Sequence, residues 1–518
     1  MAEMHVVQMF LQPETLKRYG LYEFDAWSAS FGEAVTGIEL APDGSGFRTN
    51  TRFCKFVNVS ELMAIFKGVA DIRTKRMLNL PTPRIEGGKP QEIRVMPRRK
   101  TAEPDDEALL DLVQRQTLGY FWDFAHPACG MARERSNVTP RYGLEAVTTG
   151  GTGFGVLAII VGVARGWIAR GEAVERLWTM LRFLLKADSY HGIWPHFLNG
   201  DTGRTIPFSR KDDGADLVET SFLLAGLLCA RQFFDGADEA EARVRAAIDW
   251  LWQEAEWSWH TQDGRNVLYW HWSPNNGWSM NHEIRGWNEC LITYVLAASA
   301  PRYPIAPDIY HRGWADGRDF LNGRTYDGTT LPLGPDWGGP LFLSQYSFLG
   351  LDPRGLSDRY ADYWQQNVAH TRINHDYCVR NPHGFEGYGP DCWGLTASDS
   401  TNGYDAHSPT NDRGVISPTA ALSAYPYAPE ASLRALRHFL GPLRDRIWGE
   451  YGFIDAFSET DDWYAGSHLA IDQGPIVVMI ENGRSGLIWK LLMSCPEIVR
   501  GLRRLDFRGP GLADGAGA

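Results

Sequence analysis

The 518-residue sequence is short of positive charge. Its 51 Lys and Arg residues face 63 Asp and Glu residues, which gives a formal net charge of −12 at pH 7. Surfaces that bind nucleic acid or anionic membranes need a basic footprint. The deficit argues against both kinds of partner, so we expect the chain to bind neither nucleic acid nor a membrane.

Motifs for metal, nucleotide and serine chemistry are missing too. The seven cysteines are scattered, with no C-x-x-C pair, so neither a disulfide framework nor a zinc site is indicated. NHEIRG (281–286) is not H-E-x-x-H, because Gly286 stands where the second His belongs. The G-x-G-x-x-A run at 153–158 lacks the preceding apolar strand of a Rossmann site, and there is no G-x-S-x-G elbow. We expect no metal and no cofactor.

Long hydrophobic runs are also absent. The first 20 residues lack the basic start and apolar core of a signal peptide. The longest apolar run, about 154–164, is too short and too rich in glycine to span a bilayer. We expect a monomer that is cytoplasmic as the sequence is written.

Residues 1–104 differ from the rest of the chain. Apolar patches such as GEAVTGIELA and a turn at PDGSG predict a small α+β appendage over 1–80, and the Pro/Gly/Lys/Arg-rich stretch 81–104 is a linker by composition. QPETLKRYGLYEFDAWSASFGE and KGVADIRTKRMLNLPTPRIEGGKP resemble a piece of plasmid- and phage-borne helicase/DNA-methylase polypeptides. The segment has no Walker-type phosphate loop and no methylase motif, so we interpret it as a catalytically silent remnant.

From Asp105 onward the apolar period is that of helices almost throughout. The first helix of most pairs is small, apolar and Gly-rich and the second is amphipathic, as suits inner helices within a solvent-facing ring. Six such hairpins predict an all-α (α/α)6 toroid over 105–507, with a disordered tail at 508–518. An open solenoid is the alternative, but no sequence repeat supports it. The expected helices are 105–125, 151–167, 171–187, 215–234, 238–257, 284–299, about 309–320, 338–351, 357–379, 417–427, 429–448 and 473–494.

Six carboxylates lie at or near the junctions between loops and predicted inner helices. Each could be a structural acid that caps a helix or pairs with Arg. Their number at one end of a toroid favours glycoside hydrolysis, which needs a protonated acid for the leaving oxygen and a carboxylate base for water. The 20 Trp and 20 Tyr residues fit the same chemistry because aromatic faces pack on sugar rings, although a Trp-rich core would explain many of them. The acids are Asp212, Asp216, Glu219, Glu289, Asp455 and Asp472.

Motifs along the helical region resemble the bacterial glucoamylase-like family, which includes endo-β-1,2-glucanases. They are TGGTGFG (149–155), WPHFLNGDTG (194–203), KDDGADLVET (211–220), YGPDCWGLTASD (388–399) and AFSETDDWYAGSHLAIDQGPIVVMIEN (456–482). The resemblance covers about 105–507 and implies an (α/α)6 barrel whose β-1,2-glucanases invert the anomeric centre.

The resemblance also implies roles for individual residues. Glu289 is expected to be the general acid, since an apolar helix would raise its pKa by desolvation. Asp472, in preference to Asp455, is expected to be the base because it immediately precedes an inner helix. The residues expected to hold the glucan are Asp212, Asp216, Glu219, Trp194, His196, Trp287, Trp393 and Trp463.

Three functions remain open on the sequence. The first is an inverting hydrolase that cuts linear or cyclic β-1,2-glucan internally, with exo action or another glucan linkage as a variant. The second is a non-catalytic glucan-binding protein, which loss of Glu289 would leave unaffected. The third is a nucleic-acid module at the N-terminus, against which the acidic balance counts.

Overall fold

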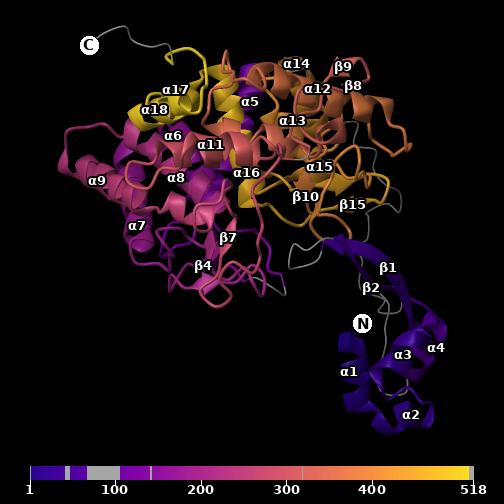
Figure 1. Cartoon of the computed structure of the whole chain (residues 1–518). Helices are drawn as coiled ribbons and strands as arrows, with labels where there is room; N and C mark the ends of the chain where they lie inside the picture. Colours follow the sequence, from indigo (N-terminus) through magenta and orange to yellow (C-terminus); the bar gives the residue numbers. More distant parts are fainter. Residues whose placement is uncertain (1, 41–46, 67–104, 140–142, 318, 513–518) are drawn as a thin grey trace, which may run out of the picture. The chain divides into compact units, whose positions relative to one another are not determined.

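The computed structural model describes residues 2–40, 47–66, 105–139, 143–317 and 319–512 (Figure 1). The chain divides into two compact units, Met1–Glu103 and Pro104–Ala518. The expected linker, 81–104, lies outside the described residues, so its assignment stays a prediction. No helix within the described ranges has the length and apolar character needed to cross a membrane.

The first unit is the predicted α+β appendage. An antiparallel hairpin pairs Gly32 with Phe56 at one end and Leu40 with Phe47 at the other. Leu16, Trp27 and Leu62 are buried in a small core of their own. The elements are α1 (Ala2–Leu11), α2 (Pro13–Arg18), α3 (Phe24–Phe31), β1 (Gly32–Leu40), β2 (Phe47–Phe56) and α4 (Val59–Phe66).

The second unit is built around a closed ring of inner elements. Helix α6 packs against α8 and α16, α10 packs against α8 and η5, and α13 packs against α16. Gln345 closes the ring, because its side-chain amide donates a 3.0 Å hydrogen bond to the carbonyl of Ala420 in α13. The inner elements are α6 (Thr149–Ala164), α8 (Leu217–Phe233), α10 (Leu291–Ser299), η4 (Leu341–Ser344), η5 (Ser347–Leu349), α13 (Pro418–Ser423) and α16 (Ala470–Arg484).

The remaining helices pack outside this ring, as their polar outward faces require. Helix α5 packs against both α6 and α16, so a helix early in the second unit meets one late in the chain. These contacts confirm the predicted all-α toroid. The outer helices are α5 (Asp106–Trp122), α7 (Arg170–Leu184), α9 (Glu239–Glu254), α11 (Pro307–Ile309), α12 (Tyr363–Arg380), α14 (Pro429–Leu440), α15 (Arg444–Ile447), α17 (Leu487–Met493) and α18 (Pro496–Arg504), with single turns η1 (Trp257–Thr261), η2 (Tyr310–Trp314) and η3 (Asp336–Gly338).

Short strands stiffen the loops between the helices. Strands β3, β4 and β5 form a three-stranded antiparallel sheet, and the others of this unit pair as two-stranded ladders. The strands are β3 (Ala146–Thr148), β4 (Phe197–Asn199), β5 (Thr205–Ile206), β6 (Ala215–Asp216), β7 (His271–Trp272), β8 (Thr325–Tyr326), β9 (Thr329–Thr330), β10 (Ala397–Ser398), β11 (Asp405–Ala406), β12 (Trp448–Gly449), β13 (Gly452–Phe453), β14 (Phe457–Ser458) and β15 (Trp463–Tyr464).

Glycine allows the first two inner helices to approach closely. A Cβ atom on Gly153 would lie 2.2 Å from the carbonyl oxygen of Phe222, and one on Gly226 would lie 2.3 Å from the carbonyl oxygen of Gly153. These contacts are with backbone, which cannot rotate away. The Gly-rich motif at 149–155 is therefore a helix-packing motif.

Several expectations differ from the structure. The helix expected over 473–494 is two helices, α16 and α17, and the first begins at Ala470, so Asp472 lies within its first turn and does not precede it. The helix expected over 284–299 begins only at Leu291, so Glu289 lies in the preceding turn. The helix expected over 338–351 is two 3-10 turns, where the Ser347 hydroxyl bonds the backbone of Glu289 and Ile292 instead of a helical neighbour. Residues 508–512 are ordered, because Arg508 exchanges backbone hydrogen bonds with Ser357 and Leu512 is buried; 513–518 lie outside the described residues.

Candidate active site

The starts of the inner helices bring polar side chains to one end of the ring. Asp216 caps α8, Glu219 lies in its first turn, and Asp472 lies in the first turn of α16. Glu289 is two residues before α10. The partial positive charge of a helix start favours carboxylates at such positions.

Asp216 is held by backbone amides and by two histidines. Its Oδ1 accepts hydrogen bonds from the amides of Val218, at 3.1 Å, and Glu219, at 3.0 Å. His196 Nδ1 lies 3.0 Å and His271 Nε2 lies 3.8 Å from Asp216 Oδ2. Burial alone would raise the pKa of Asp216, but the hydrogen bond with His196 and the nearby histidines hold it below its ordinary value.

His196 and His271 have opposite charge preferences. Burial opposes a charge on His196, yet Glu219 and Asp216 outweigh it and raise its pKa to about 9. Burial lowers the pKa of His271 to about 4, so this ring is neutral at pH 7. Its Nε2 lies 3.3 Å from Asp212 Oδ2. Burial, followed by the charge of Asp216, raises the pKa of Asp212 to about 7.

Glu219 joins this cluster to the start of α6. Its Oε2 accepts a 2.8 Å hydrogen bond from the amide of Gly150 and a 3.4 Å hydrogen bond from the hydroxyl of Thr148. Burial raises its pKa despite the charge of His196. Three of the four acids of KDDGADLVET, namely Asp212, Asp216 and Glu219, therefore form one network with His196 and His271.

Glu289 carries a carboxyl group with a raised pKa. Burial raises its pKa to about 7, and the charges of Glu219 and Asp216 act in the same direction. The turn that carries it is held by Ser347, whose hydroxyl donates a 2.5 Å hydrogen bond to the Glu289 carbonyl. Its carboxyl is thus substantially protonated at neutral pH.

Asp455 and Asp472 form a second buried carboxyl pair. Each is 1% exposed, and Asp455 Oδ1 and Asp472 Oδ2 are buried with no hydrogen-bond partner among the described residues. Burial raises the pKa of Asp455 to about 7, and the charge of Asp399 adds to the effect. Burial raises the pKa of Asp472 well above its ordinary value, and the neighbouring Asp455 raises it further. Two buried carboxyls in contact cannot both be ionised without a large cost, so the pair retains one proton.

Five residues that the sequence did not single out surround this pair. The Asp399 amide donates a 2.6 Å hydrogen bond to Asp455 Oδ2, while its carboxylate pairs with Arg135 at 3.1 Å. Glu134 pairs with Arg135 at 2.8 Å. Tyr346 donates a 3.5 Å hydrogen bond to Asp472 Oδ1. Tyr404 is 51% exposed, and the pKa of its hydroxyl is raised by the crowding of protein atoms and then by Asp472 and Asp455.

Tyr346 links the pair electrostatically to Glu289. Burial raises its pKa well above the ordinary value, and Asp472, Glu289 and Asp455 all contribute to that rise.

Asp399 could have been found from the quoted YGPDCWGLTASD motif, in which it is the last residue. Tyr346 and Tyr404 carry no local signal, because they stand in loops among many other aromatic residues.

Three tryptophans expected to contact sugar are core residues. Trp194 is 2% exposed, Trp287 is 4% exposed and Trp393 is 0% exposed. Trp287 packs against Tyr363 at a centroid distance of 5.8 Å. A ring covered on both faces cannot stack on a sugar, so their expected role is corrected. Trp463 in β15 is half-buried and His196 is 25% exposed, so both can still meet a ligand.

One metal-compatible arrangement lies within this site. Single ligand atoms of Asp212, Asp216 and His271 lie within 4.8 Å of one another. His271 already stands between the two carboxylates, as described above, and its Nδ1 is buried without a hydrogen-bond partner among the described residues. The distances of 3.3 Å and 3.8 Å are those of contacts between an imidazole and two carboxylates.

Comparisons with known proteins identify relatives that share this architecture. The Glycoamylase family model matches residues 281–496. A solved protein from Bacteroides uniformis ATCC 8492 is 60% identical, with a TM-score of 0.77, over 79% of this chain and 99% of that one. An endo-β-1,2-glucanase from Chitinophaga pinensis, solved with sophorotriose and glucose, is 53% identical, with a TM-score of 0.77, over 79% and 99% of the two chains.

A curated relative carries a different activity. It is the exo β-1,2-glucooligosaccharide sophorohydrolase (non-reducing end) from Parabacteroides distasonis, 45% identical over 422 residues. The match covers 77% of this chain, which spans 58% of the length of that relative.

Proposed function

Because the chain belongs to the glycoamylase family of glycoside hydrolases, we propose that it cleaves internal linkages of β-1,2-glucans, with inversion at the anomeric carbon. The observation that carries the proposal is the pairing of one protonatable acid, Glu289, with the buried carboxyls of Asp455 and Asp472. An acid and a base of this kind are what glycosidic hydrolysis requires.

Glu289 acts as the general acid in this proposal. It donates its proton to the glycosidic oxygen as the bond to the anomeric carbon breaks. Its pKa of about 7 leaves a large protonated fraction at neutral pH, which a carboxyl at its ordinary value would not have. Burial, which disfavours the ionised form of the carboxyl group, is the largest cause of the shift.

Asp472 acts as the general base. It removes a proton from the water that attacks the anomeric carbon, and the product carries the inverted configuration. Asp472 contacts Tyr346, whose hydroxyl also lies in the field of Glu289, whereas Asp455 is bonded on its other side to the amide of Asp399. For Asp472 to act as base it must be ionised, so the proton that the pair retains must move to Asp455, although burial and the charge of Asp455 raise the pKa of Asp472 more than that of Asp455.

Asp212, Asp216 and Glu219 hold sugar hydroxyls beside the reacting bond. Their carboxylates accept hydrogen bonds, and charged His196 next to them donates. Tyr404, which is half exposed, offers a ring face and a hydroxyl near the carboxyl pair of Asp455 and Asp472. Trp463 offers a second ring. Together these residues offer ring faces to the apolar faces of the sugar rings and polar groups to the sugar hydroxyls.

An exo mode is the second candidate, because the 45% identical relative from Parabacteroides distasonis is an exo sophorohydrolase. The two modes differ in their early products. Incubation with long linear β-1,2-glucan and chromatography at early times gives a ladder of oligosaccharides for internal cleavage. Exclusive release of sophorose from the first time point contradicts internal cleavage and favours the exo mode. Soluble starch and laminarin serve as linkage controls; digestion of either in place of the β-1,2-glucan overturns the proposed linkage.

A further inference from the structure

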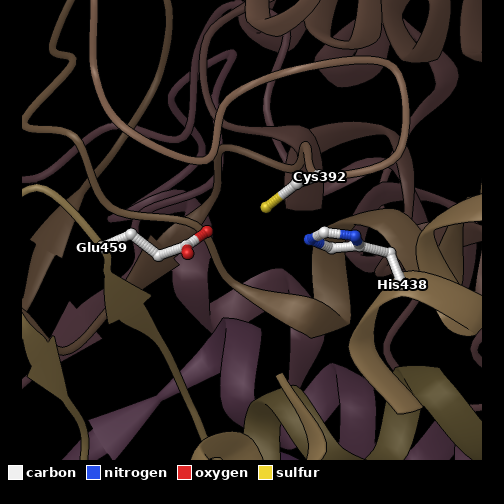
Figure 2. Close-up of side chains that lie close together, drawn as sticks. All are labelled: Cys392, His438 and Glu459. Atoms are coloured by element: carbon white, nitrogen blue, oxygen red, sulfur yellow. The ribbon is translucent and has the colours of Figure 1, made fainter. Parts of the chain in front are cut away.

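A second cluster of reactive side chains lies apart from the carboxylates described above. Cys392, His438 and Glu459 come from three separate elements: the loop before β10, helix α14 and the hairpin of β14 and β15. One ligand atom of each lies within 4.8 Å of the others. Figure 2 shows the thiol, the imidazole and the carboxylate pointing into the same space.

The polar atoms of this cluster are buried and lack partners. Cys392 is 2% exposed. His438 Nε2 and Glu459 Oε1 are buried and have no hydrogen-bond partner among the described residues. A buried polar atom without a partner is costly, and such atoms in a native fold usually bind a water or an ion.

The backbone leaves room for the Glu459 carboxylate. Gly387 has φ = +82°, and a Cβ atom there would lie 2.0 Å from Glu459 Oε1. Only glycine fits both this backbone conformation and this approach. The carboxylate is therefore held against the loop that carries Cys392, and the amide of Glu386 fastens the same hairpin through a 2.8 Å hydrogen bond to the Thr460 hydroxyl.

The charge around Cys392 is negative. The Glu459 carboxylate belongs to the cluster, and Asp391 directly precedes Cys392 in the chain. Arg434 faces Asp391 at 3.2 Å and partly balances it. A reactive nucleophilic cysteine needs the opposite surroundings, with cations that stabilise the thiolate. A negative potential instead attracts a cation.

We propose that Cys392, His438 and Glu459 bind one divalent cation of the zinc type. Sulfur, imidazole nitrogen and carboxylate oxygen are the ligands that Zn²⁺ takes in proteins, with a water in the fourth position of a three-ligand site. Tetrahedral zinc holds its ligand atoms roughly 3.5 Å apart, so small side-chain rotations close the present cluster around the ion. Binding displaces the thiol proton to solvent.

The cation would hold together two segments of the chain that lie next to Asp455 and Asp472, the carboxyl pair that contains the proposed base. The loop that carries Cys392 continues to Asp399, and Glu459 lies four residues after Asp455. Asp399 and Asp455 are joined by the 2.6 Å hydrogen bond described above. A metal that ties these two segments together therefore fixes Asp455 beside Asp472. It takes no part in bond cleavage in this proposal.

The test is metal stoichiometry of the purified full-length chain. The protein is stripped with chelator, incubated with excess ZnCl₂, desalted and assayed for zinc by mass spectrometry. One zinc per chain is expected in the wild type and in Cys378→Ser, which removes another buried cysteine of the same core cluster. Cys392→Ser and Glu459→Gln are expected to lose the ion or bind it at least about tenfold more weakly.

Cobalt provides a readout on the unmodified protein, which does not depend on a variant that folds. Co²⁺ bound through Cys392 gives a thiolate-to-metal charge-transfer band in the near ultraviolet, absent in Cys392→Ser. A wild-type chain that retains no zinc and gives no such band overturns the proposal. Zinc that persists unchanged in Cys392→Ser but is lost in His271→Asn also overturns it, because the ion then binds at Asp212, Asp216 and His271.

Discussion

Gly150 and Glu219 link the first two inner helices through one hydrogen bond. The amide of Gly150, at the start of α6, donates to Glu219 Oε2 in α8 at 2.8 Å. A Cβ atom on Gly150 would lie 2.6 Å from that same oxygen. The glycines of the 149–155 motif thus serve two purposes at once: they let the helices meet, and they position Glu219, an acid that we propose holds the sugar.

Substitution of Gly153 is expected to destabilise the fold. In Gly153→Ala the new methyl group meets the backbone of Phe222 in α8, so the helices must separate. We expect a loss of roughly 1–3 kcal/mol in the free energy of unfolding, as for other overpacked cores. Gly171→Ala is the matched control, because nothing lies within 4 Å of a Cβ there, and it should stabilise α7 by about 0.5–1 kcal/mol. Denaturant unfolding that ranks the two variants in the opposite order would refute this packing role.

Substitutions of Tyr404 and Trp393 are expected to change different properties: KM for Tyr404 and the free energy of unfolding for Trp393. Tyr404→Ala removes a half-exposed ring and should raise KM with little change in the melting temperature. Trp393→Phe leaves a void around a fully buried side chain and should lower the free energy of unfolding by roughly 1–3 kcal/mol while KM stays close to that of the wild type. Thermal melts and initial rates on β-1,2-gluco-oligosaccharides separate the two. A large KM effect in Trp393→Phe would restore the stacking role that its burial argues against.

The activity should fall as pH rises through about 7. The folded-state pKa of Glu289 is raised to about 7, so the general acid is protonated below that value and loses its proton above it. Once the acid is mostly ionised, kcat/KM should drop about tenfold per pH unit. His196 does not account for this limb, because its pKa of about 9 keeps it charged through neutrality. A profile that stays flat from pH 7 to pH 9 contradicts Glu289 as the acid.

The two aspartates of the buried pair should differ in severity. Asp472→Asn removes the proposed base and should lower kcat by roughly 10²-fold to 10⁴-fold. Asp455→Asn keeps the contact with Asp472 and the hydrogen bond from the Asp399 amide, so it should retain more activity. Azide or formate, which can replace a missing base, should rescue Asp472→Asn. Rescue of Asp455→Asn alone would exchange the two roles.

The helical toroid and its family could be predicted from the sequence because both depend on local pattern. Asp105, the first residue of the helix expected over 105–125, caps α5 by accepting a 2.8 Å hydrogen bond from the Ala108 amide. The motif-based resemblance was confirmed by relatives that cover almost the whole second unit. By contrast, the N-terminal resemblance to helicase/methylase polypeptides stays a prediction.

The details of the site depended on contacts that no local pattern encodes. Glu289 was expected on a helix, yet Ser347 holds its turn from 58 residues away. Trp194, Trp287 and Trp393 looked the same as sugar-binding tryptophans because composition does not reveal burial. Cys392, His438 and Glu459 have no metal-ligand spacing in the sequence and meet only in the folded chain.

The most direct test of the account is the action of the wild type and Glu289→Gln on linear β-1,2-glucan, followed by proton NMR of the new reducing ends. The account predicts short β-1,2-gluco-oligosaccharides whose first-formed anomer is α, and loss of turnover in Glu289→Gln, while Glu283→Gln, which removes an acid in the same loop that pairs with Arg285, stays active. Retention of the β anomer, or unchanged turnover in a folded Glu289→Gln variant, would contradict it.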